Sequence, residues 1–122
     1  MGKRILLIED EKDMVAAITF RLESAGYTII AAYDGMEGLD KARSENPDLI
    51  ILDLMLPKMN GYKVCAALKT DEKYKKIPIL ILSAKAQEVD RKMSEEAGAD
   101  IYMSKPFEAQ ELMTNIKNLL KE

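Results

Sequence analysis

Short apolar runs alternate along the chain with longer stretches in which apolar residues recur every three or four positions. The runs are rich in β-branched residues, and their length suits strands buried on both faces of a sheet. They comprise residues 5–8, 27–33, 49–52, 79–82 and 99–103. Strands that alternate with helices form parallel sheets covered on both faces, so the pattern predicts an α/β fold with five parallel strands.

The stretches between the runs have the periodicity of amphipathic helices. Their apolar stripes comprise Val15, Ile18 and Leu22; Met36, Leu39 and Ala42; Val64 and Leu68; Val89, Met93 and Ala97; and Leu112, Ile116, Leu119 and Leu120. Asp34 and Glu37 have the spacing of a capping box at a helix start. Gly26 and Gly98 stand where a helix ends in a left-handed residue. Right-handed crossovers between the strands then leave only a few doubly wound strand orders.

The composition agrees with one globular domain. Of the 122 residues, 48% are hydrophobic and 32% are charged, so we expect a single domain over residues 1–122. The net charge is −3, and Lys and Arg form no dominant block, which argues against direct binding of nucleic acid. No apolar run approaches the ~20 residues of a membrane helix or resembles a signal peptide. We therefore expect a cytoplasmic protein without membrane insertion.

Two residue types limit the chemistry that the chain can perform. The sequence contains no His and a single Cys, Cys65. This excludes His-dependent nucleophilic sites, His-ligated metals and an internal disulfide. We expect Cys65 to be a buried helix residue without a redox role. Any reaction must rely on carboxylates, lysines, hydroxyl groups and hard cations.

Polar residues follow the predicted strands at their carboxyl ends, where doubly wound sheets bind ligands. Glu9 and Asp10 follow the first strand, and Asp53 follows the third. Ser83 follows the fourth, and Lys105 comes shortly after the fifth. Acids brought together repel one another, and oxygen ligands with room for water favour Mg²⁺. With a lysine and a hydroxyl group beside them, the pattern favours phosphoryl transfer with Asp53 as the nucleophile.

Each of these residues also has an ordinary structural explanation. An acid after a strand often caps a helix, a serine there often bonds locally, and most lysines are solvated surface groups. Asp53 is different because apolar residues flank it on both sides, and an isolated buried acid is costly. The hypothesis of a site therefore rests on the joint placement of these residues.

The chain resembles the receiver domain of bacterial response regulators along its whole length. The segments that carry the resemblance are ILLIEDE at 5–11, PDLIILDLMLP at 47–57, NG at 60–61, PILILSA at 78–84, and AGAD at 97–100 leading to KPF at 105–107. The resemblance implies the flavodoxin-like strand order 2-1-3-4-5, with helices on both faces. It also implies a phosphoacceptor switch in two-component signal transduction rather than an enzyme.

The resemblance assigns roles to the residues around Asp53. Asp53 would be the phosphoacceptor, and Mg²⁺ would be held by Glu9, Asp10, Asp53 and the backbone carbonyl of Met55. The Met55 side chain would also flank the phosphoryl group. Its bulk, together with the length of the Lys85 side chain, is expected to hinder attack by water, so the phosphorylated form should not be among the fastest to decay.

The resemblance also assigns roles to residues of the fourth and fifth strands and the loops after them. Ser83 and Lys105 would contact oxygens of the phosphoryl group. Tyr102 would turn inward when Ser83 moves, as the second residue of the switch. Ala84 and Lys85 would flank the phosphoryl group beside Ser83. The peptide bond after Lys105 is expected to be cis.

The partners follow from the same resemblance. The donor would be a phosphohistidine on a sensor histidine kinase or a histidine phosphotransfer protein. Phosphorylation would switch the surface of the fourth helix, fifth strand and fifth helix toward an output domain or a downstream protein. A homodimer through this surface is left open, because Arg91 and Glu111 supply one charge pair whereas Ile101 and Asn115 replace another. Both a stand-alone receiver and a piece of a longer regulator agree with the sequence.

The fourth helix has a narrow apolar stripe, formed by Val89, Met93 and Ala97, among many charged residues. This pattern predicts either a weakly anchored helix that takes part in the switch or an ordinary surface helix.

Three other classes of protein share part of this pattern. A phosphatase similar to the haloacid-dehalogenase superfamily would need a second Asp two residues after Asp53, where Met55 stands. A flavin-binding carrier would need a loop rich in Gly and hydroxyl groups after the first strand, where residues 9–11 are all acidic. A receiver that acts without phosphorylation usually lacks one of the acids or the lysine, and this chain has them all.

Overall fold

The computed structural model describes residues 2–85 and 87–122. Strands and helices alternate in the order β1 (Arg4–Ile8), α1 (Lys12–Ser24), β2 (Thr28–Ala32), α2 (Gly35–Glu45), β3 (Leu49–Leu52), α3 (Gly61–Lys69), β4 (Ile79–Ser83), α4 (Glu88–Glu96), β5 (Ile101–Ser104) and α5 (Ala109–Leu120). All strand pairs are parallel, and the sheet order is β2-β1-β3-β4-β5, as predicted. Among the described helices, none has the length and apolar character needed to cross a bilayer.

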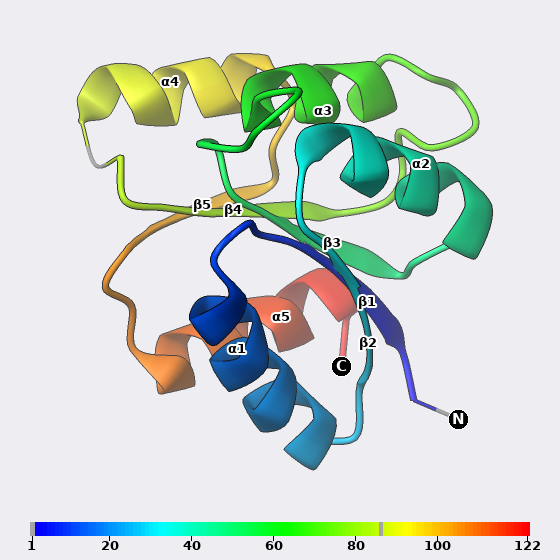
Figure 1. Cartoon of the computed structure of the whole chain (residues 1–122), viewed down its shortest axis with the longest axis vertical. Helices are drawn as coiled ribbons and strands as arrows, with labels where there is room; N and C mark the ends of the chain where they lie inside the picture. The colour runs from blue at the N-terminus through cyan, green and yellow to red at the C-terminus, as the bar shows by residue number, and fades with distance from the viewer. Residues whose placement is uncertain (1, 86) are drawn as a thin grey trace.

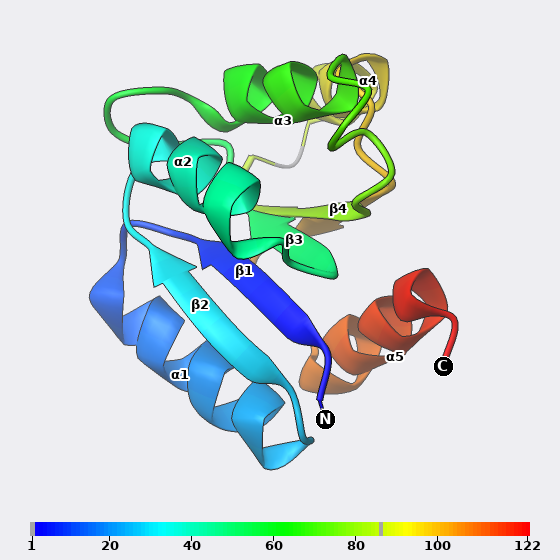
Figure 2. The same ribbon diagram turned by 90° about the vertical axis from the view of Figure 1, so that its right-hand side faces the viewer.

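Helices cover both faces of the sheet. Figures 1 and 2 show α1 and α5 on one face and α2, α3 and α4 on the other. Successive residues of a strand point to opposite faces. In β1, Ile5 and Leu7 pack with residues of α1 and α5, whereas Leu6 and Ile8 pack with residues of α2 and α3. The strand is therefore apolar at each of these positions because it contributes to two cores.

The predicted helix boundaries rest on capping contacts that the structure contains. The amide of Glu37 donates to Asp34 Oδ1 at 2.7 Å, and the amide of Tyr33 donates to Glu37 Oε1 at 2.7 Å. The capping box is therefore present, but the Glu37 side chain accepts from the amide of Tyr33, the residue before Asp34, and not from that of Asp34 itself. Gly26 and Gly98 have φ angles of 98° and 97°, which confirms the predicted left-handed helix ends.

Two strands begin later than the predicted runs, whereas β1 begins one residue earlier, at Arg4. β5 begins at Ile101 rather than at residue 99, because Asp100 has another role. Its carboxylate accepts from the amide of Ile79 at 2.8 Å and pairs with Lys69 at 3.0 Å. Tyr27 precedes β2, and its amide donates to the carbonyl of Leu22 at the end of α1. Both residues therefore belong to connections, although each lies within a predicted strand run.

Helix α4 buries a different stripe from the predicted one. Val89 and Met93 are 56% and 45% exposed, whereas Asp90 and Ser94 are buried. Of the predicted stripe, Ala97 alone packs against the core. The predicted apolar stripe is therefore wrong as the buried face of this helix at Val89 and Met93, and the inward face is polar.

Candidate functional site

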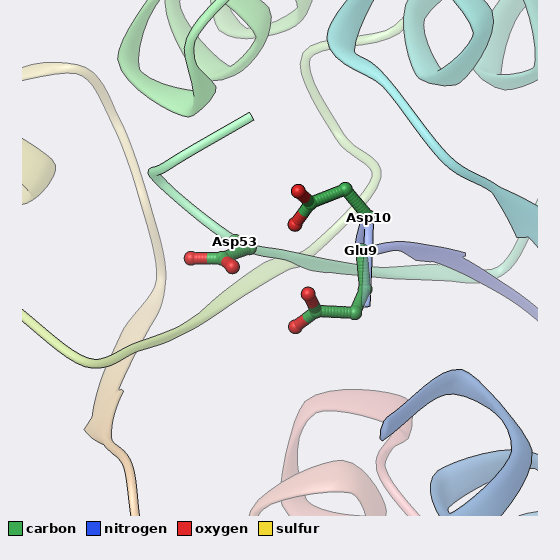
Figure 3. Close-up of side chains that lie close together, drawn as sticks. All are labelled: Glu9, Asp10 and Asp53. Atoms are coloured by element: carbon green, nitrogen blue, oxygen red, sulfur yellow. The ribbon is translucent and has the colours of Figure 1, made fainter. Parts of the chain in front are cut away.

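The predicted acids meet at the carboxyl-terminal edge of the sheet, where β1 and β3 are neighbours. Ile8 pairs with Leu52 at the end of the two strands, so Glu9 and Asp53 emerge from adjacent positions. The amide of Asp53 donates to the carbonyl of Ile8 at 3.0 Å and continues this pairing by one residue. Figure 3 shows that Asp10 joins them from the chain just after β1. Strand pairing thus brings together acids that are far apart in sequence.

The acid cluster, formed by Glu9, Asp10 and Asp53, has the geometry of a metal site. One carboxylate oxygen from each residue lies within 4.8 Å of the others. Glu9 and Asp53 are buried and Asp10 is exposed, so the cluster opens to solvent on one side. Carboxylate ligands with access for water suit a hard divalent cation. The residues therefore fit a metal ion, whereas the contribution of the Met55 carbonyl stays a prediction.

Lys105 reaches the same acids from the loop after β5. Its ammonium lies 2.5 Å from Glu9 Oε1 and 3.3 Å from Asp53 Oδ2. Its backbone amide donates to the carbonyl of Ser83 at 2.8 Å and ties this loop to the end of β4. The Lys105–Pro106 peptide bond is cis, as the resemblance implied. The lysine thus provides one positive charge that two carboxylates share.

Burial and mutual charge shift the pKa values at this site. Burial raises the pKa of the Glu9 carboxyl above its usual value, and the hydrogen bond from Lys105 offsets only part of this effect. Burial alone would lower the pKa of Lys105, but the hydrogen bond to Glu9 and the charge of Asp53 outweigh it and raise that pKa. Lys105 therefore stays positively charged at neutral pH, and the acids favour a further cation.

The residues predicted to flank a phosphoryl group lie around the same edge. Ser83 is fully buried at the end of β4, and its Oγ accepts from the amide of Lys85 at 3.3 Å. Ala84 is exposed. Met55 and Lys85 line an open hollow together with Asp10 of the acid cluster. Of the three residues predicted to flank the phosphoryl group, Met55 and Lys85 therefore share a hollow with Asp10. Met55 comes from the loop after β3, and Lys85 from the loop after β4.

Tyr102, the predicted switch residue, lies in β5 and packs against the core under α2 and α3. The guanidinium of Arg91 lies 5.1 Å from the centre of its ring. The hydroxyl group is buried and has no hydrogen-bond partner within the described part of the chain. Burial and the charges of Asp90 and Asp53 raise the pKa of Tyr102, and the charge of Arg91 offsets part of this effect, so the phenol stays protonated.

Three residues near the site had no predicted role. A side chain at Gly61 would collide with the carbonyl oxygen of Asp53, and the Gly61 amide donates to Leu54 at 2.9 Å. The NG pair at 60–61 is the sequence signal for this close approach. Tyr62 and Asp90 form a hydrogen bond of 3.1 Å between α3 and α4. No sequence motif marked that bond, because it depends on how two helices pack.

The fold and the site together define a doubly wound α/β protein with an acidic, lysine-containing site at the carboxyl edge of its sheet. The family model for the response regulator receiver domain matches residues 5–117. The chain therefore belongs to the receiver domain family of two-component response regulators.

Two curated relatives cover nearly all of the chain. It is 45% identical over 121 residues to the alkaline phosphatase synthesis transcriptional regulatory protein PhoP of Bacillus subtilis (strain 168), covering 99% of this chain and 50% of that protein. It is 42% identical over 118 residues to the DNA-binding dual master transcriptional regulator RpaA of Synechocystis sp., covering 97% and 49%. The chain thus spans about half the length of the curated relatives it matches.

A solved structure supports the same assignment. The receiver domain of the sensor histidine kinase PA1611 from Pseudomonas aeruginosa PAO1 superposes with a TM-score of 0.92 at 30% identity, over 100% of both chains. That structure has a magnesium ion coordinated in its active site cleft.

Proposed function

We propose that this receiver accepts a phosphoryl group on Asp53 from a phosphohistidine of a sensor histidine kinase or a histidine phosphotransfer protein. The observation that carries the proposal is the position of the Asp53 carboxylate. It is 7% exposed, lies 3.3 Å from the Lys105 ammonium and shares the acid cluster with Glu9 and Asp10. Such a group combines a nucleophile with adjacent positive charge at an edge that solvent reaches.

The transfer requires few parts from the protein. A carboxylate oxygen of Asp53 forms a bond to phosphorus as the bond from phosphorus to the donor's imidazole nitrogen breaks, and that nitrogen keeps the electron pair. Lys105 pairs with one phosphoryl oxygen and holds it in place for the attack. Ser83, once it turns from Lys85, donates its hydroxyl hydrogen bond to another oxygen. Positioning and charge neutralisation of this kind account for most catalysis of phosphoryl transfer.

We propose Mg²⁺ as the ion for the acid cluster, held by Glu9, Asp10 and Asp53 and by the carbonyl of Met55. When bound, it supplies positive charge that neutralises the phosphoryl oxygens. Glu9 must be deprotonated to act as a ligand, and Lys105 must give up part of its contact with Glu9. The three carboxylates and the open side of the cluster support this assignment.

We propose that the chain is a switch without a separate enzymatic activity, and that it acts in the cytoplasm. Its output is the surface of α4, β5 and α5, which contacts an output domain or a downstream protein, or a second copy through Arg91 and Glu111. The names of both curated relatives describe transcriptional regulators, which supports an output in transcription.

The proposal is tested by phosphorylation with acetyl phosphate or phosphoramidate in the presence of Mg²⁺, followed by intact mass measurement. Wild-type protein and the Asp40→Asn control, at an exposed position of α2, should each gain one phosphoryl group. Asp53→Asn should gain none, and chelation of Mg²⁺ should abolish the gain. A gain that persists in Asp53→Asn would contradict the assigned residue. No gain in wild-type protein with either donor would contradict the function.

A further inference from the structure

The amino-terminal half of α4 is attached to the molecule through polar groups. Asp90 and Ser94 are its buried residues, whereas Val89 and Met93 face solvent. The Ser94 hydroxyl donates to the Asp90 carbonyl at 2.9 Å, which is a bond within the helix. The carboxyl-terminal end is held differently, by the packing of Ala97 against the core. The Asp90 side chain therefore links the first turn of α4 to other elements by hydrogen bonding, and the Arg91 guanidinium adds a contact with the Tyr102 ring of β5.

Asp90 is bound by a tyrosine of the neighbouring helix. The hydroxyl of Tyr62, in α3, donates to Asp90 Oδ1 at 3.1 Å. Burial and this hydrogen bond raise the pKa of Tyr62 to about 12, so the phenol remains a donor at neutral pH. Asp90 is only 8% exposed. A bond to a charged acceptor in such a place is stronger than a bond between neutral groups.

The same carboxylate is linked to the loop that carries Ser83. The ammonium of Lys85 lies 3.9 Å from Asp90 Oδ1, and the Lys85 amide donates to Ser83 Oγ at 3.3 Å. Tyr62 and Lys85 also line the hollow that contains Asp10. A movement of Ser83 toward the phosphoryl group would break its bond to the Lys85 amide. Lys85 would then be free to leave Asp90, which would keep the bond from Tyr62.

A second tyrosine next to this group has an unused hydroxyl. The buried Tyr102 hydroxyl finds no hydrogen-bond partner in residues 2–85 and 87–122, and the charge of Asp90 is among the causes of its raised pKa. A buried hydroxyl without a partner is unfavourable. A rearrangement near α4 that supplied a hydrogen-bond partner to the Tyr102 hydroxyl would therefore be favourable for this residue.

We propose that the Tyr62–Asp90 hydrogen bond is a latch that holds α4 in the position it has in the unphosphorylated protein, so that removing the bond favours the phosphorylated form. The link to phosphorylation rests on the function proposed above. Tyr62 and Asp90 are positioning residues in this account, because neither contacts the acid cluster or the phosphoryl group.

The latch is tested first without any phosphoryl donor, by amide hydrogen exchange of residues 88–96 in Tyr62→Phe. This variant removes one oxygen and leaves the ring in place, and we expect exchange in α4 to become about tenfold faster. Tyr74→Phe is the matched control, because its exposed hydroxyl lies 3.5 Å from the Arg43 carbonyl, and it should leave α4 unchanged. Asp90→Asn keeps an acceptor for Tyr62 and should have a smaller effect. Unchanged exchange in Tyr62→Phe would overturn the latch.

The link to the switch is tested by the initial rate of phosphorylation from acetyl phosphate. We expect Tyr62→Phe to be phosphorylated about threefold faster than wild type. Without the latch, the conformation that phosphorylation favours is already more populated in the unphosphorylated protein. Faster exchange with an unchanged phosphorylation rate would overturn the link and keep the latch. Absence of phosphorylation in the wild type would overturn the proposed function, and the exchange measurement would still decide on the latch by itself.

Discussion

Helices α4 and α5 cover opposite faces of the sheet and are held there by different forces. Helix α5 buries Leu112 and Ile116 in the core that it shares with α1, whereas α4 buries Asp90 and Ser94. Apolar burial depends on area and has no preferred direction, so it tolerates small displacements. A hydrogen bond is directional and is lost when its atoms separate by about 1 Å. Helix α5 can thus keep its contacts through small displacements, whereas the attachment of α4 depends on a bond that a change at the site can break. We therefore expect α4 to be the helix that moves.

The largest expected effect on the free energy of unfolding comes from a substitution in the apolar face of α5. Ile116→Ala should lower the free energy of unfolding by about 3 kcal/mol, because it leaves a cavity in a fully buried part of α5. Thr114→Ala, at an exposed position of the same helix, should change it by less than about 0.5 kcal/mol. Urea denaturation monitored by circular dichroism measures both. A loss below about 1 kcal/mol for Ile116→Ala would show that α5 is not held as described.

A smaller effect is expected at the acid cluster. Mg²⁺ at ten times its dissociation constant should raise the free energy of unfolding by about 1.4 kcal/mol, because it binds the folded acids only. Asp10→Asn should remove most of this gain, whereas Asp13→Asn, at an exposed position of α1, should retain it. A gain that is unaffected by Asp10→Asn would place the ion elsewhere.

The same site should show a defined pH dependence. The folded pKa of Glu9 is raised, and a protonated carboxyl cannot coordinate a metal. Mg²⁺ affinity should therefore fall as pH decreases toward that pKa, and the fall should begin at a higher pH than for an exposed glutamate. Titration calorimetry at several pH values measures this. A constant affinity down to the usual pKa of glutamate would contradict the raised value.

The smallest effect is expected on the outward face of α4. Met93→Ser should change the free energy of unfolding by less than about 0.5 kcal/mol, because its side chain is 45% exposed and does not contribute to the buried core. Met103→Ser is the contrasting variant, since Met103 is buried in β5, and it should be clearly destabilising. Equal destabilisation by the two changes would mean that α4 packs on its apolar stripe after all.

Most of the fold was accessible from the sequence because the buried strands are short and apolar and alternate with amphipathic stretches. The acids could also be placed together, since Glu9 and Asp53 each follow a predicted strand and parallel strands end at one edge. The strand order came from the resemblance to receiver domains. The roles assigned to Ser83 and Tyr102 also came from it and stay predictions.

The face that α4 buries could not be read from its periodicity. Val89 and Met93 are four residues apart, and so are Asp90 and Ser94, so each pair defines a possible inward stripe. The choice depends on Tyr62, which is 28 residues from Asp90 in the chain. Hydrophobic patterns carry no information on such a partner. Likewise, the late start of β5 follows from the contacts of Asp100 with the beginning of β4, which an apolar run does not reveal.

The acid cluster also has a consequence for how this domain tolerates mutation. Three carboxylates meet at the end of the sheet and one lysine pairs with two of them. Burial raises the pKa of Glu9, so the fold holds the charge of Glu9 at an energetic disadvantage. Substitutions that neutralise these acids are therefore expected to make the folded chain more robust while they remove its reactive group. Selection for thermal stability alone would drive this domain toward an inert protein, so robustness has to be engineered in the α5 core instead.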